Sequence, residues 1–424
     1  MTKRRHHPIR DRLRGFGYFG RLGPAIVTGA ADDDPSGIGT YSQVGAALGF
    51  GMLWTALVTL PLAAAVQETA ARIGIASDGG LATALKRRYP RWVLWLAVSL
   101  VTVANVFNIA ADIGSMAAAF RLLVPVPLGV AMVALVAALL ALEIFVRYER
   151  YARVLRWLSL SVVSYVAVLF VLRVDWGDVL RATFLPRLAL DRTQLAALVA
   201  IFGTTISPYL FFWQASEEAE EEELEAARGE VVVDRDHVAA MRGDVVAGMA
   251  SAVVVMFAIM VAAAATLHAE GITQIRTAED AARALRPIAG DFASLLFTLG
   301  IVGTGALAIP ILAGSTAYAL SEAFGWREGL SRRLRQAGGF YGVIVGSAAL
   351  GLIIALAGLD PIRGLYWAAI LNGVAAPPLI LLMLLLGRDR SIVGEWRSGR
   401  VSTALVAVAF VVMAAAPLAF LAGR

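Results

Sequence analysis

Long apolar stretches follow one another along almost the whole chain, and they limit what this sequence can fold into. Most are about 20 residues or longer, which is the length that an α-helix needs to cross a bilayer. Of the 424 residues, 59% are hydrophobic and 16% are charged, with a mean hydropathy of +0.72, whereas a soluble domain carries about 25% charged residues. The sequence therefore predicts an all-α polytopic membrane protein. The eleven predicted spans are residues 20–48, 51–73, 92–118, 125–146, 153–173, 195–216, 243–268, 292–323, 337–357, 362–387 and 401–421.

The basic residues between these spans predict an orientation. With the N-terminus inside, the inner segments hold 25 Lys and Arg residues and the outer segments hold 10. Short cytoplasmic loops of membrane proteins are enriched in such residues. We therefore expect a multi-pass protein of the cell inner membrane with a cytoplasmic N-terminus and an external C-terminus. The weakest part of this assignment is the predicted outer loop 174–194, which also contains arginines.

Composition and charge placement exclude several classes of function. The net charge of +5 does not indicate a nucleic-acid partner, because the basic residues lie in short loops beside apolar spans rather than on one face. The chain has no cysteine, so it has neither disulfides nor thiolate metal ligands. No nucleophile–base pair is visible in the sequence. We therefore expect neither an enzyme nor a bound cofactor.

The first predicted span is interrupted by three consecutive acids, Asp32, Asp33 and Asp34, followed by Pro35. Each acid at the centre of a bilayer costs roughly 2.5–3.5 kcal/mol on insertion scales, and proline removes a backbone donor. Such a segment is tolerated only against protein or a water-filled cavity, where it can hold a cation. The alternative is that the acids lie at the membrane interface, but that leaves the apolar stretch 22–31 without a place.

A second interruption, at Ser207-Pro208, lies five helices later. Interrupted helices at corresponding positions of two halves are typical of inverted-repeat transporters that bind substrate between the breaks. The spacing therefore predicts two inverted five-helix repeats. The predicted organisation is a cytoplasmic basic tail (1–19), a first repeat (20–173), a second repeat (195–387) and an eleventh helix (401–421).

The side chains at the two interruptions offer hard ligands. Asp33, Asp34, Thr204 and Ser207 supply only oxygen, and neither interruption contains His, Cys or Met. Oxygen ligands suit Mg²⁺, Ca²⁺ or Mn²⁺, whereas Zn²⁺ and Cu⁺ prefer nitrogen or sulfur. The interruptions therefore predict a site for a hard divalent cation, and an organic cation or a Na⁺-coupled amino acid remains chemically open.

Other polar residues within the spans have two readings each. Asn108 and Asp112 are four residues apart and share a helix face, so they could line an ion path or only join two helices. Asn372 could reach the cation site or pack against small residues. The acidic run Glu217–Glu225 could be a solvated helix end or a vestibule that attracts cations.

At these interruptions the sequence resembles the Nramp family of divalent-metal transporters, which have the LeuT-like fold. The family has Asp-Pro-Gly-Asn in its first broken helix and Ala-x-x-Met-Pro-His in its sixth. The matching stretches here are Asp34-Pro35-Ser36-Gly37 and Thr204-Thr205-Ile206-Ser207-Pro208-Tyr209. The stretch from Gln67 to Pro90 is similar to the family's junction between the second and third helices.

The resemblance implies a metal site centred on Asp34, with a backbone carbonyl from Thr204. Several positions depart from the family pattern. Ser207 replaces the metal-binding methionine and Gly37 the asparagine ligand, Tyr209 and Gln214 replace two histidines, and Asp112 matches only loosely the acid that serves proton transfer. A hydroxyl does not favour soft metals as a thioether does, and Mg²⁺ retains its waters in a site with fewer ligands. The pattern is similar to the Nramp-related magnesium-transporter branch and puts proton coupling in doubt.

We therefore expect a secondary transporter of a hard divalent cation, Mg²⁺ or Mn²⁺, that works by alternating access with Asp34 as the main ligand. Asp33, Thr204, Ser207 and Gly37 would complete the site, with Tyr209, Gln214, Asp112 and Asn372 as accessory polar residues. The expected partners are the cation and the lipid bilayer. The alternatives are a conventional proton-coupled Mn²⁺/Fe²⁺ importer and a Na⁺-coupled organic-substrate carrier on the same fold.

Overall fold

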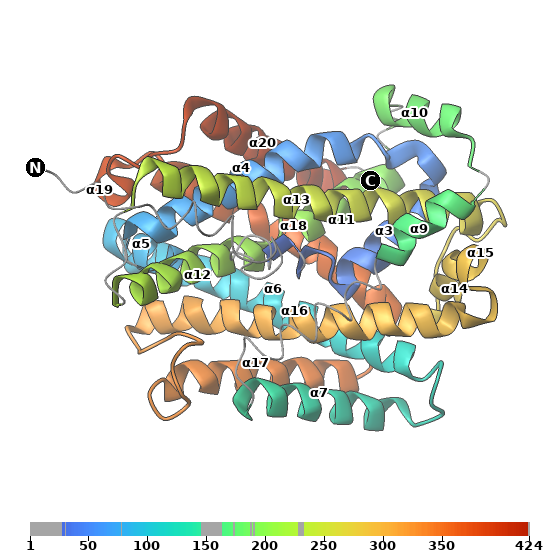
Figure 1. Cartoon of the computed structure of the whole chain (residues 1–424), viewed down its shortest axis with the longest axis horizontal. Coiled ribbons are helices and arrows are strands. Elements are labelled where there is room, and N and C mark those ends of the chain that lie inside the picture. The colour runs from blue at the N-terminus through green and yellow to red at the C-terminus, as the bar shows by residue number, and fades with distance from the viewer. Residues whose placement is uncertain are drawn as a thin grey trace, which may run out of the picture.

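Helices account for the regular structure of the chain in the computed structural model, which describes residues 28–422 except 30, 78, 146–162, 173, 187–188, 190 and 228–232. No strand occurs in this part of the chain. The long helices run side by side and form an elongated bundle (Figure 1). The predicted tail 1–19 and large parts of the first and fifth predicted spans lie outside the described residues.

The helices of the first half are α3 (Pro35–Leu48), η1 (Gly49–Met52), α4 (Thr55–Ser77), α5 (Leu81–Arg88), α6 (Arg91–Phe120), α7 (Leu128–Phe145), α9 (Val163–Val171) and α10 (Trp176–Phe184). Those that follow are α11 (Arg192–Thr205), α12 (Pro208–Ala227), α13 (Arg235–Ala263), η3 (Ala264–His268), α14 (Ala278–Ala282), η4 (Arg283–Leu285), α15 (Arg286–Ala289), η5 (Gly290–Phe292), α16 (Ala293–Phe324), α17 (Gly338–Leu356), α18 (Pro361–Leu386), α19 (Arg390–Val393) and α20 (Arg400–Ala422).

Eight helical stretches among the described residues are long and apolar enough to cross a membrane. They correspond to eight of the eleven predicted spans, with α11 and α12 forming one interrupted stretch. A further pair of helices, residues 35–52 and 55–77, passes the same test together but is bent by 115°. Within the first of these stretches, Gly49 ends α3 and begins η1 with φ of 57°, a conformation that glycine adopts without strain. The predicted all-α polytopic architecture is therefore confirmed.

Two groups of helices surround a central set. On one side α16 packs along α6 and α17, and α7 contacts both α6 and α17. On the other side α13 and α20 pack against α4 (Figure 1). The interrupted helices lie between these groups, where α3 contacts α13 and α18, and α11 contacts α18. The bundle therefore places both interruptions in its interior.

The contact between α11 and α18 is close because glycine faces glycine. A Cβ added to Gly203 would lie 2.1 Å from the Ala369 carbonyl oxygen and 2.4 Å from the Gly373 nitrogen. Small residues of this kind allow the backbones of two membrane helices to approach each other. This contact holds the end of α11, and with it the second interruption, against α18.

Short helices lie in the segments that join the spans. The predicted outer loop 174–194 contains α10, for which the Asp175 side chain is the N-cap. The predicted inner segment before α6 contains α5, where Lys86 donates to backbone carbonyls at the end of α16. Arg88 pairs with Asp389 before α19. These two predicted inner segments therefore lie at one end of the bundle, while their side of the membrane stays a prediction.

The acidic run after the second interruption is partly tied to the rest of the protein. Glu220 accepts hydrogen bonds from the Tyr318 hydroxyl on α16 and from the backbone N–H groups of Leu330 and Ser331. Glu223 pairs with Arg332. Several of these acids therefore fasten the end of α12 to α16 and the loop after it, which a freely solvated helix end would not do.

Candidate functional site

The first interruption is a turn at Asp33 and Asp34, after which α3 begins at Pro35. Proline suits the first turn of a helix, where its missing N–H needs no partner. Asp34 is the N-cap of α3. Its Oδ1 atom accepts hydrogen bonds of 2.7 Å from the Gly37 backbone N–H and 2.7 Å from the Ser36 hydroxyl. The local sequence thus aims one oxygen of a buried carboxylate at the start of α3.

The second interruption separates α11, which ends at Thr205, from α12, which begins at Pro208. The Ser207 hydroxyl lies 2.7 Å from the Gly203 carbonyl oxygen and 2.6 Å from the Thr204 carbonyl oxygen, both of which can accept its proton. These carbonyls have lost their usual helical partners because the helix stops here. The second interruption is therefore neutral and is stabilised by its own serine.

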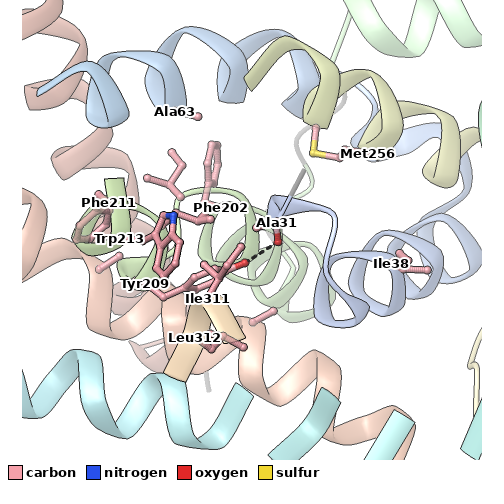
Figure 2. Packing of buried hydrophobic residues seen from close by; sticks show 14 of the residues in the cluster. Ala31, Ile38, Ala63, Phe202, Tyr209, Phe211, Trp213, Met256, Ile311 and Leu312 are labelled. Atoms are coloured by element: carbon pink, nitrogen blue, oxygen red, sulfur yellow. Dashed lines mark hydrogen bonds between the residues drawn. The ribbon is translucent and has the colours of Figure 1, made fainter. Parts of the chain in front are cut away.

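Three side-chain contacts join the two interruptions. The Tyr209 hydroxyl donates to the Ala31 carbonyl oxygen at 2.9 Å (Figure 2) and to Asp34 Oδ2 at 3.2 Å. The Ser36 and Thr204 hydroxyl oxygens lie 3.2 Å apart. The residues on both sides of the first interruption are thus connected to the second one, and Asp34 lies where the two meet.

A further polar contact involves Thr205, the residue after Thr204 and the last residue of α11. The hydroxyls of Tyr41 and Thr205 are 2.7 Å apart. The Met256 sulfur, which belongs to α13, accepts from the Thr205 hydroxyl at 3.8 Å. A thioether therefore approaches the second interruption on its Thr205 side, from a helix in which the sequence indicated no ligand.

Four acids are buried at or near the interruptions, namely Asp32, Asp33, Asp34 and Asp112. Asp112 lies on α6, and its charge acts on that of Asp34. None of the four forms an ion pair with Lys, Arg or His within the described residues. Because an isolated buried charge is costly, this region favours the binding of a cation.

Several predicted site residues lie together. Asp34, Thr204 and Tyr209 are linked by the contacts described above, and Gly37 contributes its backbone N–H to Asp34. A Cβ on Gly37 would lie 3.0 Å from the Asp32 carbonyl oxygen and 3.5 Å from Asp34 Oδ1. The absence of a side chain at position 37 therefore leaves space beside the Asp34 carboxylate and places no side-chain amide there.

Two predicted accessory residues have partners of their own. The Asn108 amide donates to the Asn372 side-chain oxygen at 2.9 Å, so these residues join α6 to α18. The Gln214 oxygen accepts from the Thr28 hydroxyl at 2.7 Å, and its amide donates to Glu218 at 2.8 Å. Gln214 therefore fastens α12 to the helical segment before the first interruption.

Sequence reasoning missed Ser36, Tyr41 and Thr205 as members of this polar region, and it did not select Asp32. Ser36 could have been found, because a hydroxyl two residues after a capping aspartate can reach its carboxylate. The position of Tyr41 opposite Thr205 depends on the packing of α3 against α11, which no local signal reports.

The chemistry of the region is that of oxygen donors. Carboxylates, hydroxyls and backbone carbonyls lie around Asp34, and no group of three or more His, Cys, Asp or Glu side chains suited to a metal ion occurs among the described residues. A cation here would depend on one or two carboxylates together with carbonyls, hydroxyls and water. Mg²⁺ is commonly bound in this way, with several waters retained.

Comparison with known families and curated proteins gives a consistent result. The family described as natural resistance-associated macrophage protein-like, or Nramp, matches residues 25–423. A divalent metal cation transporter MntH from Deinococcus radiodurans is 26% identical over 386 residues, covering 88% of this chain and 83% of the relative. A protein of the same name from Caldanaerobacter subterraneus is 25% identical over 383 residues, with 88% and 86% covered.

Solved structures have the same fold. The manganese transporter of Eremococcus coleocola, in complex with an aromatic bis-isothiourea substituted compound, superposes with a TM-score of 0.73 at 17% identity, covering 98% of this chain and 87% of that one. Mhp1, a nucleobase-cation-symport-1 family transporter, superposes with a TM-score of 0.58 at 13% identity, with 95% and 91% covered. These similarities confirm the predicted LeuT-like fold.

Proposed function

This chain belongs to the Nramp family, and from that premise we propose that it is a secondary transporter of divalent metal cations and favours a hard ion such as Mg²⁺ or Mn²⁺. The curated relatives that match most of its length are named as divalent metal cation transporters. We further propose that it lies in the inner membrane with its N-terminus in the cytoplasm. This orientation rests on the excess of basic residues in the predicted inner segments.

The observation that carries the proposal is the position of Asp34. Its carboxylate is buried in the bundle and lies where the two interruptions meet, within hydrogen-bond distance of Ser36 on one and Tyr209 on the other. A cation bound there would contact both interrupted helices at once. Movement of one against the other could then open the site to either side, which is the essence of alternating access.

The preference for a hard ion follows from the donors beside Asp34. Ser207 supplies a hydroxyl and Gly37 no side chain at the two positions where the family pattern has methionine and asparagine. The Thr204 carbonyl and the Asp33 carboxylate are the further oxygens available for direct or water-mediated contact. With a hydroxyl instead of a thioether at position 207, soft metals lose that ligand's preference for them over Mg²⁺.

Transport by Asp34→Asn in proteoliposomes tests the proposal. We expect the flux of Mg²⁺ and Mn²⁺ to fall by about 100-fold or more, because loss of one charged partner of a buried pair costs about 3–5 kcal/mol and each 1.4 kcal/mol is a factor of ten. Asp191→Asn is the matched control. Asp191 is also a helix N-cap that accepts from the N–H three residues later, but it is exposed. Undiminished metal flux in Asp34→Asn would remove the basis of the proposal.

Ser207→Met tests the choice of ion. Because it adds the missing thioether, we expect it to increase the ratio of Mn²⁺ to Mg²⁺ transport. A conventional Mn²⁺/Fe²⁺ importer predicts a different result in the unmodified protein. Its Mn²⁺ flux would be unaffected by a large excess of Mg²⁺ and would acidify the vesicle lumen, and that outcome would favour the importer.

A further inference from the structure

Neighbouring acids of the first interruption differ in how far the protein satisfies them. The Asp34 carboxylate accepts three hydrogen bonds, from Ser36, Gly37 and Tyr209. Asp32 is equally buried, with 1% of its surface exposed, yet neither of its carboxylate oxygens has a hydrogen-bond partner among the described residues. The Asp32 carboxylate therefore lacks the hydrogen-bond donors that Asp34 has, and a cation would stabilise its charge more.

The neighbouring acid adds a further carboxylate oxygen that lacks a hydrogen-bond partner within the described residues. Asp33 follows Asp32 directly, is 8% exposed and has one oxygen, Oδ1, without a partner. With 1% of its surface exposed, the Asp32 side chain lies inside the bundle rather than on a lipid-facing surface.

An independent observation comes from a different helix. Asp112 on α6 is fully buried, and neither of its carboxylate oxygens has a partner among the described residues. Because α6 contacts both α3 and α12, Asp112 belongs to the same buried region of the bundle as the two interruptions. A single divalent ion at Asp34 would supply two positive charges to a region that holds four carboxyl groups.

We propose that Asp32 is the main carboxylate of a second hard-cation subsite, beside the one at Asp34 and completed by Asp33 Oδ1. The proposal rests on the proposed function, because both subsites lie in the same buried interruption. The two subsites have different roles for their acids. Asp34 caps α3 and joins the interrupted helices, whereas the Asp32 carboxylate has no hydrogen-bond partner in the part of the chain that the structure describes and can bind a cation directly.

Counting bound Mn²⁺ ions tests the subsite. The full-length protein in lipid nanodiscs is titrated with Mn²⁺, and free ion is measured by electron paramagnetic resonance. We expect two Mn²⁺ per chain in the unmodified protein and one in Asp32→Asn, while Asp191→Asn retains two. Excess Mg²⁺ should displace both ions, since both subsites offer oxygen ligands.

Further variants separate the two subsites. Asp32→Glu retains a carboxylate and should retain two ions, which guards against a loss caused only by misfolding. One Mn²⁺ per chain in the unmodified protein, or two in Asp32→Asn, would overturn the proposal. If the unmodified protein binds one Mn²⁺ and Asp34→Asn binds none, the proposed function stands while the proposal of a second subsite is wrong. If Asp34→Asn still transports Mn²⁺ at an undiminished rate, the proposed function itself fails.

Discussion

The two interruptions differ in what stabilises them. The second one is neutral, and Ser207 satisfies the carbonyls that the broken helix leaves free. The first contains three buried acids, of which only Asp34 is well supplied with donors. The polar groups of the second interruption thus have hydrogen-bond partners within the protein, whereas the first requires a positive group. In a transporter, the first interruption could supply the charge that binds the cation. The second could supply the neutral groups on the opposite side of the site.

The largest expected effect comes from adding a methyl group at each interruption. A Cβ on Gly203 would lie 2.1 Å from the Ala369 carbonyl oxygen, so Gly203→Ala should push α11 away from α18. Overpacking of this kind costs about 1–3 kcal/mol. A Cβ on Gly37 meets the Asp32 oxygen at 3.0 Å, which requires only a small shift. We expect Gly203→Ala to lower the thermal midpoint more than Gly37→Ala does.

Gly243→Ala provides the control for that measurement. Gly243 lies in α13 and is exposed, and nothing lies within 4 Å of an added Cβ. Alanine is favoured over glycine in a helix by about 0.5–1 kcal/mol, so this variant should be neutral or slightly more stable. An equal loss of stability at Gly37 and Gly203 would contradict the view that only the second interruption is held by steric fit.

An intermediate effect is expected for Tyr209→Phe, which removes the hydroxyl that connects the interruptions. Its shorter hydrogen bond goes to the neutral Ala31 carbonyl oxygen, and a bond of this kind contributes about 0.5–1.5 kcal/mol. We expect a lower free energy of unfolding and a changed apparent KM for the divalent cation. Tyr318→Phe removes a comparable contact, with Glu217 and Glu220 at the far end of α12. If Tyr318→Phe changes the KM as much as Tyr209→Phe does, the link between the interruptions has no special role.

The smallest effect is expected far from both interruptions, at the pair of Arg88 and Asp389. Hydrogen bonds from Ser391 and then from Arg88 lower the pKa of Asp389 from 3.8 to about 2. A carboxyl whose pKa is lowered on folding stabilises the folded protein at pH values above its unfolded pKa of 3.8. This stabilisation is lost as the pH falls from there through about 2. The difference in thermal midpoint between Asp389→Asn and the unmodified protein should therefore be small and constant from pH 5 to 8. A difference that grows across that range would show that another group titrates with this pair.

The positions of the interruptions could be predicted from sequence because their causes are local. Proline removes a backbone hydrogen-bond donor, and consecutive acids cannot face lipid. The three acids before Pro35, and Ser207 before Pro208 five helices later, therefore indicate the two sites. The partners across the interruptions could not be predicted in this way. Tyr209 donates to a backbone carbonyl 178 residues earlier, and any residue at position 31 would supply that carbonyl.

Other assignments depended on distant packing. Asn372 and Gln214 were plausible site residues by position, yet each is engaged with a neighbour that only the folded bundle brings close, Asn108 and Thr28. By contrast, the helix α10 within the predicted loop 174–194 has a local signal in its capping residue, Asp175. A search for N-caps inside the predicted loops would have found it.

The order of synthesis has a consequence at the short helix α5. The Thr83 backbone N–H in its first turn donates at 2.7 Å to Glu322, which lies 239 residues later on α16. A ribosome adds about 5–20 residues per second, so roughly 12–50 seconds pass between the two. During that interval the nascent chain must hold α5 without this acceptor. The end of the bundle that contains α5 can close only after α16 has entered the membrane.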